Sequence, residues 1–275
     1  MSGRLGFVAA ITVLALAGST MPASAEAPPL PNSMAAIGDS ITRAVDACCI
    51  YGDHPHKSWA TGDIAGDSVL SQYERILAGN PAIAGFNFND SEDGAKMDDA
   101  PGQAAVAVGQ SPEYVAILMG GNDLCTPTIE EMTSVEDFRS QFQTTMDTLG
   151  AGLPPNAHIF VSSIPNVYLL WKNFRWDPIA QAIWALAGIC QSLLSTSNNE
   201  EDRQAVATRN RELNDVLAEV CAQYANCLFD GYAVFNFRFT KKDVSKLDYF
   251  HPSLDGQKHL ASVTWATSWW GDAGP

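Results

Sequence analysis

The stretch Met34–Thr42, MAAIGDSIT, joins a short apolar run to a serine that stands where the run ends. The apolar residues predict a short buried strand, and Gly38-Asp39-Ser40 follow it directly. Two roles suit Ser40. Its hydroxyl could cap a helix by accepting from a backbone N–H two or three residues on, or it could be a nucleophile. The remaining blocks of the chain decide between these roles.

Strand-like and helix-like patterns alternate along the chain. Strands are predicted at 35–37, 86–88, 114–119 and 158–163, and helices at 69–78, 100–108, 135–149 and 203–224. The later two strands are apolar almost throughout, which is typical of a parallel sheet that helices cover on both faces. We therefore predict an α/β fold, a three-layer α/β/α sandwich with a central, mostly parallel sheet of flavodoxin-like type. No internal repeat or linker divides residues 34–275, so they are expected to form one domain.

A second block follows the predicted strand at 114–119. It reads Gly120-Gly121-Asn122-Asp123, in which the glycines allow close backbone approach and the Asn122 amide can donate hydrogen bonds. A turn would explain this block in isolation. In an open parallel sheet, however, ligands bind where the carboxyl ends of the strands meet, and Ser40 is expected at that same edge.

A third block lies near the C-terminus and reads Asp248-Tyr249-Phe250-His251-Pro252. The proline disfavours helix at His251, so a bend is predicted. Within a bend, the three-residue offset can bring the Asp248 carboxylate to one ring nitrogen of His251 and leave the other free as a base. A surface turn ahead of a helix at 254–269 is the alternative.

Together these blocks resemble the SGNH, or GDSL-type, serine hydrolases. The blocks at Gly38-Asp39-Ser40, the second-strand loop with Gly94, Gly121-Asn122-Asp123 and Asp248-x-x-His251 occur in the family's order and spacing. The resemblance implies Ser40 as nucleophile, His251 as general base and acid, and Asp248 as the residue that orients His251. It also implies an oxyanion hole made of the Ser40 and Gly94 backbone N–H groups and the Asn122 side chain, with no cofactor and no metal. The segment Cys48–Gly62, CCIYGDHPHKSWATG, is similar to the secreted, disulfide-bearing actinobacterial branch of that family.

The second block departs from the family pattern because Asp90, Glu92 and Asp93 precede Gly94. Carboxylates close to an oxyanion hole are unfavourable unless they point to solvent, which makes Gly94 a weaker assignment than Asn122. Asp39 is interpreted as holding the turn. The α/β-hydrolase fold is excluded because the chain has no G-x-S-x-G motif and its serine opens the domain.

The substrate is predicted less sharply than the chemistry. Residues 167–194 are strongly apolar, with Asp177 as a helix cap and Pro178 at the first helical position. Such a helix is normally buried, and both an acyl-chain wall and plain core remain open for it. We favour an esterase or lipase acting on a small-molecule or lipid ester over a carbohydrate acetylesterase. A non-catalytic secreted binding protein is disfavoured because every catalytic block is intact.

The N-terminus predicts export. Arg4, an apolar run at 5–17 and Ala23-Ser24-Ala25 resemble a signal peptide cleaved after Ala25, which leaves residues 26–33 as a short N-terminal segment. No apolar run is long enough to span a bilayer. The net charge of −15 disfavours nucleic acid and anionic membranes as partners. We expect a secreted monomer.

The six cysteines then predict disulfides, since export implies an oxidising compartment. Cys221 should end one helix and Cys227 should open the next strand, which predicts a Cys221–Cys227 bond. Cys125 and Cys190 both fall at the catalytic edge and are a second expected pair. Cys48 and Cys49 are then a vicinal pair or free thiols, and a bond from either to Cys125 or Cys190 remains open. Metal binding at His54 and His56 is weighed against an exposed loop and is disfavoured.

Overall fold

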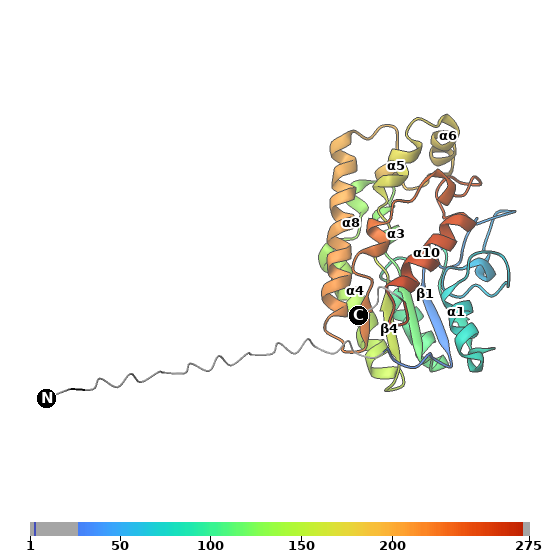
Figure 1. The fold of residues 1–275 in the computed structure, drawn as a ribbon. Helices are drawn as coiled ribbons and strands as arrows, with labels where there is room; N and C mark the ends of the chain where they lie inside the picture. Colours follow the sequence, from blue (N-terminus) through green and yellow to red (C-terminus); the bar gives the residue numbers. More distant parts are fainter. Residues whose placement is uncertain (1–2, 4–26, 272–275) are drawn as a thin grey trace.

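Five parallel strands form the central sheet of this protein, in the order β2-β1-β3-β4-β5 (Figure 1). The computed structural model describes Gly3 and residues 27–271, so the expected signal peptide falls outside the described residues apart from Gly3. The strands are β1 Met34–Gly38, β2 Asn87–Asn89, β3 Tyr114–Leu118, β4 His158–Val161 and β5 Cys227–Phe229. In register, Ala36 pairs with Ala116, and Ala116 with Phe160. The four predicted strands are confirmed within two residues at each end, and β5 begins at Cys227 as expected.

Helices cover both faces of the sheet, which confirms the predicted three-layer α/β/α sandwich. The longer ones are α1 Gln72–Gly79, α2 Ala100–Gln110, α4 Val135–Gly152, α8 Glu200–Cys221 and α10 Leu254–Ala266. The shorter ones are α3 Gly121–Leu124, α5 Tyr168–Phe174, α6 Pro178–Ala187, α7 Gln191–Leu194 and α9 Ala233–Asn236. Helices α2, α4 and α8 pack on one face, and α1 and α10 pack on the other.

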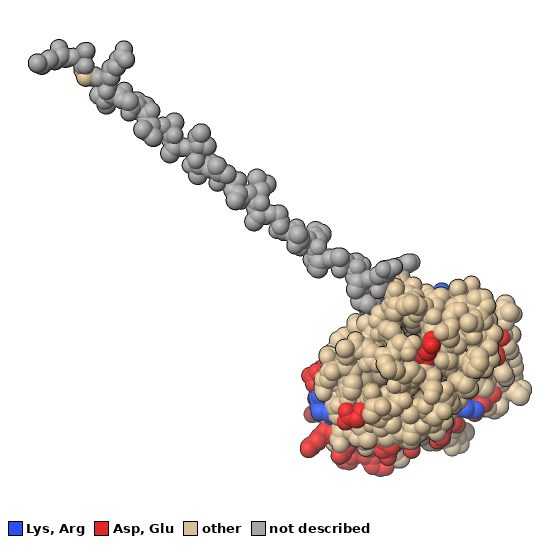
Figure 2. Space-filling model, turned by 90° about the horizontal axis from the view of Figure 1, so that it is seen from below, with Lys and Arg blue, Asp and Glu red and all other residues tan. Residues whose placement is uncertain are grey.

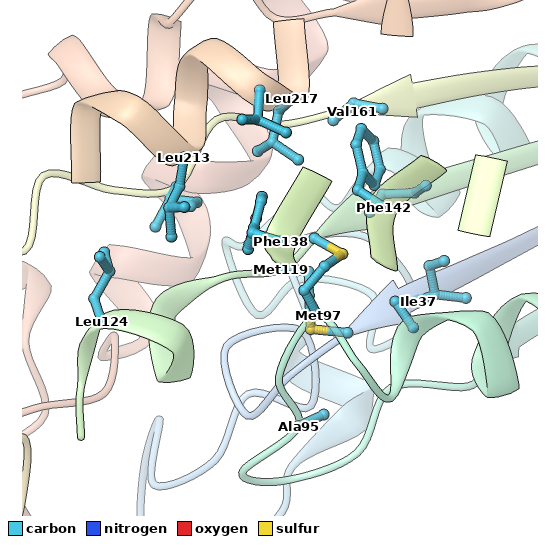
Figure 3. Close-up of a cluster of buried hydrophobic side chains, with 14 of the residues drawn as sticks. Ile37, Ala95, Met97, Met119, Leu124, Phe138, Phe142, Val161, Leu213 and Leu217 are labelled. Atoms are coloured by element: carbon cyan, nitrogen blue, oxygen red, sulfur yellow. The ribbon is translucent and has the colours of Figure 1, made fainter. Parts of the chain in front are cut away.

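The alternation of side chains along each strand divides the core into two layers. Ile37 of β1 and Val161 of β4 lie in the larger layer with Phe138 and Phe142 of α4 and with Leu213 and Leu217 of α8 (Figure 3). Met34, Ala36, Tyr114 and Phe160 point into the smaller layer. Because both faces of the central strands are buried, their sequences are apolar without a polar alternate.

The apolar segment 167–194 folds as three short helices, α5, α6 and α7. Asp177 caps α6 by accepting from the backbone N–H groups of Ile179 and Ala180, and Pro178 occupies the first helical position, as predicted. Gly188 ends α6 in the left-handed conformation, with φ of 66°. The segment sits at the carboxyl ends of the strands (Figure 1), where it forms one side of the site described below.

Two disulfides hold the fold together, Cys221–Cys227 and Cys125–Cys190. Both are the pairs expected from the positions of the cysteines, and Cys48 and Cys49 are free thiols. The bond from Cys221 at the end of α8 to Cys227 at the start of β5 closes the turn between them. The bond from Cys125 to Cys190 joins the loop after α3 to the start of α7.

The surface carries the acidic charge that the composition predicts. At the amino edge of the sheet, Asp and Glu gather along one side while Lys and Arg are few (Figure 2). Among the described residues, no helix has both the length and the hydrophobicity needed to span a bilayer.

Candidate active site

Ser40 lies in the tight turn that follows β1 and is 4% exposed. The Asp39 carboxylate accepts from the Ile41 N–H at 2.9 Å, and the Asp39 carbonyl accepts from the N–H groups of Thr42 and Arg43. These bonds confirm that Asp39 holds the turn. The Ser40 hydroxyl bonds to His251 rather than capping a helix, with 2.8 Å between Oγ and Nε2.

The predicted bend at Asp248–Pro252 brings the carboxylate to the imidazole. Asp248 Oδ2 bonds to His251 Nδ1, while Asp248 Oδ1 accepts from the backbone N–H groups of Phe250 and His251. Trp184 Nε1 donates to the Tyr249 carbonyl at 3.1 Å and fixes the bend from the α6 side. A continuous chain of hydrogen bonds therefore runs from Asp248 through His251 to Ser40. In general, such a chain allows an imidazole to take a proton from a hydroxyl while the carboxylate fixes its tautomer.

The charges around His251 favour its protonated form. Burial opposes protonation, but the hydrogen bond and charge of Asp248, with the charges of Asp93 and Asp39, outweigh it, so the pKa of His251 is raised above 6.5. Burial also works against ionisation of Asp248, yet the bonds from His251 and from the backbone lower its pKa. The two partners thus form an ion pair readily once the imidazole takes up a proton.

Asn122 lies in the short helix α3, and Gly94 lies in the loop after β2. The Asn122 side chain donates one N–H to the Ala95 carbonyl at 2.9 Å, which leaves its second N–H free. Gly94 has a φ of 76°, in the left-handed region that favours glycine. Within residues 27–271, neither the Ser40 nor the Gly94 backbone N–H donates to another protein group. Two backbone N–H groups and one N–H of the Asn122 side chain are therefore unpaired among the described residues at this edge of the sheet.

A close approach explains the glycine at position 120, just before α3. Its φ is 117°, and a Cβ there would stand 2.5 Å from the Ile164 side chain. Only glycine lets β3 end so near the loop after β4, and that contact sets where α3 begins. Asn122 is the second residue of this helix.

The acidic residues before Gly94 have different surroundings. Glu92 and Asp93 are exposed, and Asp90 accepts from Gln110 Nε2 at 2.7 Å. Of these three carboxylates, Asp93 acts on the site through its charge, which contributes to the raised pKa of His251. Asp39 is 1% exposed, and burial raises its pKa to about 7, against the opposing effect of the Ile41 N–H bond and of His251.

Asp46 is a residue of the site that the sequence analysis missed. One carboxylate oxygen each from Asp46 and Asp248 and one ring nitrogen of His251 all lie within 4.8 Å of one another. Asp46 is 7% exposed and adopts a left-handed φ of 53°, held because its Oδ1 accepts from the Gly52 N–H. Burial and the neighbouring Asp248 raise its pKa. No motif marks this position, because its approach depends on how the loop at 44–54 folds back.

The candidate metal-binding histidines make other contacts. His54 Nε2 bonds to the Ile50 carbonyl at 2.9 Å, and His56 Nδ1 bonds to Asp63. His158 opens β4 and packs edge-on against Trp269, and His259 in α10 bonds to Asp243. These four histidines therefore have local partners away from Ser40.

An apolar cavity of about 100 Å³ opens beside His251. It lies between the loop after β4 with helix α5 on one side and the turn after Ser40 on the other. Its wall includes Ile41, Ile164, Leu169, Leu170, Phe250 and His251, and Cys125 of the disulfide closes one side. The first residues of segment 167–194 thus line a cavity at the site, whereas part of α6 faces outward: Leu186 is 88% exposed.

Several solved structures are similar to this protein. A structure named as a GDSL-like lipase of Parabacteroides merdae superposes with a TM-score of 0.55 at 16% identity, covering 87% of this chain and 96% of that one. A lipolytic protein of the G-D-S-L family from Desulfitobacterium hafniense gives 0.49 at 13% identity, covering 84% and 97%. A family 3 carbohydrate esterase of Clostridium thermocellum gives 0.47 at 12% identity, covering 85% and 92%. No match was found among curated proteins.

The sequence profile of the GDSL-like lipase/acylhydrolase family matches residues 34–263, which include all the blocks that surround Ser40. That span is most of the chain. The chain therefore belongs to the GDSL-like lipase/acylhydrolase family.

Proposed function

We propose that this protein hydrolyses carboxylic esters through an acyl-enzyme formed on Ser40. The observation that carries the proposal is the chain of hydrogen bonds from Asp248 through His251 to the Ser40 hydroxyl. Membership of an acylhydrolase family supports the same chemistry. The alternative role of Ser40, a helix cap, would need its hydroxyl to accept from a backbone N–H, and among the described residues the hydroxyl bonds to His251 instead.

In the proposed reaction, Ser40 Oγ attacks the ester carbonyl while His251 Nε2 accepts the hydroxyl proton. The ester oxygen takes the negative charge, and the free N–H groups of Ser40, Gly94 and Asn122 stabilise it by hydrogen bonds. His251 then gives its proton to the departing alcohol oxygen, which leaves an acyl group on Ser40. Water, deprotonated by His251, releases the acid and restores the hydroxyl.

The apolar cavity beside His251 supports an ester with a hydrocarbon acyl chain. Most of its lining side chains are apolar, among them Leu169, Leu170 and Phe250, although Asn166, Asn173 and Asp243 also line it. We therefore place a fatty-acyl esterase ahead of a carbohydrate acetylesterase. A chain-length series of p-nitrophenyl esters tests this choice: the kcat/KM should rise from acetate to longer acyl groups, and a maximum at acetate would contradict it.

The serine chemistry itself is tested by Ser40→Ala. Hydrolysis of every ester in the series should be lost while the far-ultraviolet circular dichroism stays unchanged, because the hydroxyl contacts His251 and not the core. Near wild-type turnover in this variant would contradict the proposal. Val106→Ser, on the exposed face of α2, is a matched control that should keep full activity.

We also infer export. The two disulfides support an oxidising compartment, and the sequence before Glu26 carries the signal-peptide pattern. Sequencing the N-terminus of protein recovered from the culture medium should find Glu26 first. Recovery of the intact chain from the cell interior would contradict this inference.

A further inference from the structure

Exposed apolar side chains gather around the loop that carries Asp248 and His251. Among the described residues, nine large hydrophobic side chains are exposed, and five of them lie on only two segments near this loop. We call these five the apolar rim: Ile50 at 69% exposed, Tyr51 at 70%, Trp176 at 84%, Ile179 at 59% and Leu186 at 88%. Single exposed hydrophobic residues are common, but such a concentration marks an interaction site.

Hydrogen bonds place both segments of the apolar rim against the same loop. Tyr51 Oη donates to the Leu247 carbonyl at 2.9 Å. On the other side, Trp184 of α6 donates to the Tyr249 carbonyl. The two carbonyls flank Asp248. The apolar rim therefore borders the candidate active site from two directions.

Helix α6 has the character of an interfacial helix. Residues 178–190, PIAQAIWALAGIC, contain no charged side chain in a protein whose net charge is −15. Ile179, Ala182 and Leu186 are exposed on one face, while Ala180 and Trp184 are buried on the other. A water-facing helix normally carries charges on the outer face, so the outer face of α6 is suited to an apolar medium.

Cations stand at the border of this face. Lys172 and Arg175 are the two basic residues between positions 165 and 199. The Arg175 guanidinium lies 5.3 Å from the Trp176 ring, and the Lys172 ammonium lies 5.3 Å from the Tyr168 ring. Aromatic and basic side chains commonly lie together at the headgroup level of a lipid layer. There the cations can bind phosphate groups.

The apolar rim and the apolar cavity are formed in part by the same stretch of chain. Leu169 and Leu170 of α5 line that cavity, and α5 leads directly into Trp176 and α6. At the far end of α6, Cys190 is bonded to Cys125 in the cavity wall. The segment that carries Trp176 and Leu186 therefore also supplies one wall of the cavity beside His251.

We propose that the apolar rim docks this protein onto the surface of a lipid layer with neutral or zwitterionic headgroups. The proposal rests on the proposed function in one respect, since the acyl-chain cavity is the reason to choose lipid over another apolar partner. The overall acidity of the protein disfavours anionic lipid, and the uncharged outer face of α6 with its two bordering cations matches a phosphate-bearing zwitterionic layer.

Binding is tested without hydrolysis, in the Ser40→Ala background. Co-sedimentation with phosphatidylcholine vesicles should show binding, and adding Trp176→Ser and Leu186→Ser together should weaken the partition coefficient by about tenfold or more for each side chain removed from the layer. The matched control carries Phe86→Ser and Val106→Ser, which are 53% and 54% exposed but lie away from this edge. The control should bind as the Ser40→Ala parent does.

A second readout separates docking from chemistry. With Ser40 restored, the Trp176→Ser/Leu186→Ser variant should hydrolyse a soluble short-chain ester at the wild-type rate and an emulsified long-chain ester at least tenfold more slowly. Absence of vesicle binding by the parent, or equal binding by rim and control variants, overturns the docking proposal. Self-association through the apolar rim, seen as a dimer by light scattering that the rim variant abolishes, also overturns it. Vesicle binding without any ester hydrolysis by the wild type instead refutes the proposed function and leaves docking intact.

Discussion

Removing the Cys125–Cys190 disulfide should cost about twice as much stability as removing Cys221–Cys227. A disulfide stabilises chiefly by lowering the conformational entropy of the unfolded chain. This effect grows with the logarithm of the number of residues in the loop that the bond closes. The two bonds span 65 and 6 residues. The loop-closure relation then gives about 4 kcal/mol for the first bond and about 2 kcal/mol for the second at 25 °C.

Hydrogen bonds around Cys190 should keep the folded structure intact when the disulfide is removed. The comparison therefore tests the entropy of the unfolded chain. Ser192 N–H donates to the Thr126 carbonyl at 2.8 Å, and Ser192 Oγ donates to the Leu124 carbonyl at 2.6 Å. These bonds still join α7 to the loop after α3 when the sulfur atoms are gone. We therefore expect the folded Cys125→Ala/Cys190→Ala variant to retain hydrolysis of a short-chain ester.

Urea unfolding followed by tryptophan fluorescence measures the free energy of unfolding of the wild type and of each double alanine variant. The Cys125→Ala/Cys190→Ala variant should lose about 2 kcal/mol more than Cys221→Ala/Cys227→Ala. An equal loss, or a larger loss from the short loop, would refute the reasoning. A change in the urea dependence itself would show that the unfolded state has become less compact, as release of a 65-residue loop predicts.

Other predictions concern the candidate active site. Asn122→Ala should lower the kcat for ester hydrolysis by about 10²–10³, as expected when one oxyanion donor is lost, with little change in KM; an unchanged kcat would remove Asn122 from the site. The kcat/KM should fall on the acid side with a midpoint above 6.5, because only neutral His251 accepts the serine proton and its pKa is raised; a profile flat down to about pH 4 would argue against His251 as base. Asp46→Asn keeps an oxygen acceptor for the Gly52 N–H but removes a negative charge near His251, so the acid side of the pH profile should move to lower pH. Asp46→Ala should also reduce stability, because it removes that acceptor. An unmoved pH profile in Asp46→Asn would mean that Asp46 acts only by holding the loop.

The alternation of strands and helices around a parallel sheet could be predicted from the sequence because the central strands are buried on both faces. Burial leaves an uninterrupted apolar signature at 114–119 and 158–163, and the residues that follow such strands must meet at one edge. The same reasoning located Cys221 and Cys227, since a helix end and a strand start fix where each cysteine lies. Ser40 follows β1 directly, so its place at this edge could be predicted in the same way, whereas the contact between His251 and Ser40 was expected from the Asp248-x-x-His251 block.

Other features depend on contacts that the sequence pattern does not encode. The approach of Asp46 follows from a loop in which Ala44, Asp46 and Cys49 all have positive φ, and non-glycine residues give no advance signal of that conformation. The apolar pattern of 178–187 predicts burial, but no other described element covers the outer face of α6, so Leu186 is exposed. A hydrophobic pattern predicts which face of a helix is apolar. Whether another element covers that face depends on the topology of the whole fold.

Covalent labelling of Ser40 tests the central claim most directly. A fluorophosphonate reagent should react with the wild-type protein at one site, abolish ester hydrolysis in proportion to labelling, and appear on the Ser40 peptide by mass spectrometry, because only an activated serine attacks such a reagent readily. His251→Ala should greatly slow labelling, since it removes the base that bonds to Ser40 Oγ. Stoichiometric inactivation with the label on any residue other than Ser40, or full labelling of Ser40 in the His251→Ala variant, would contradict the account.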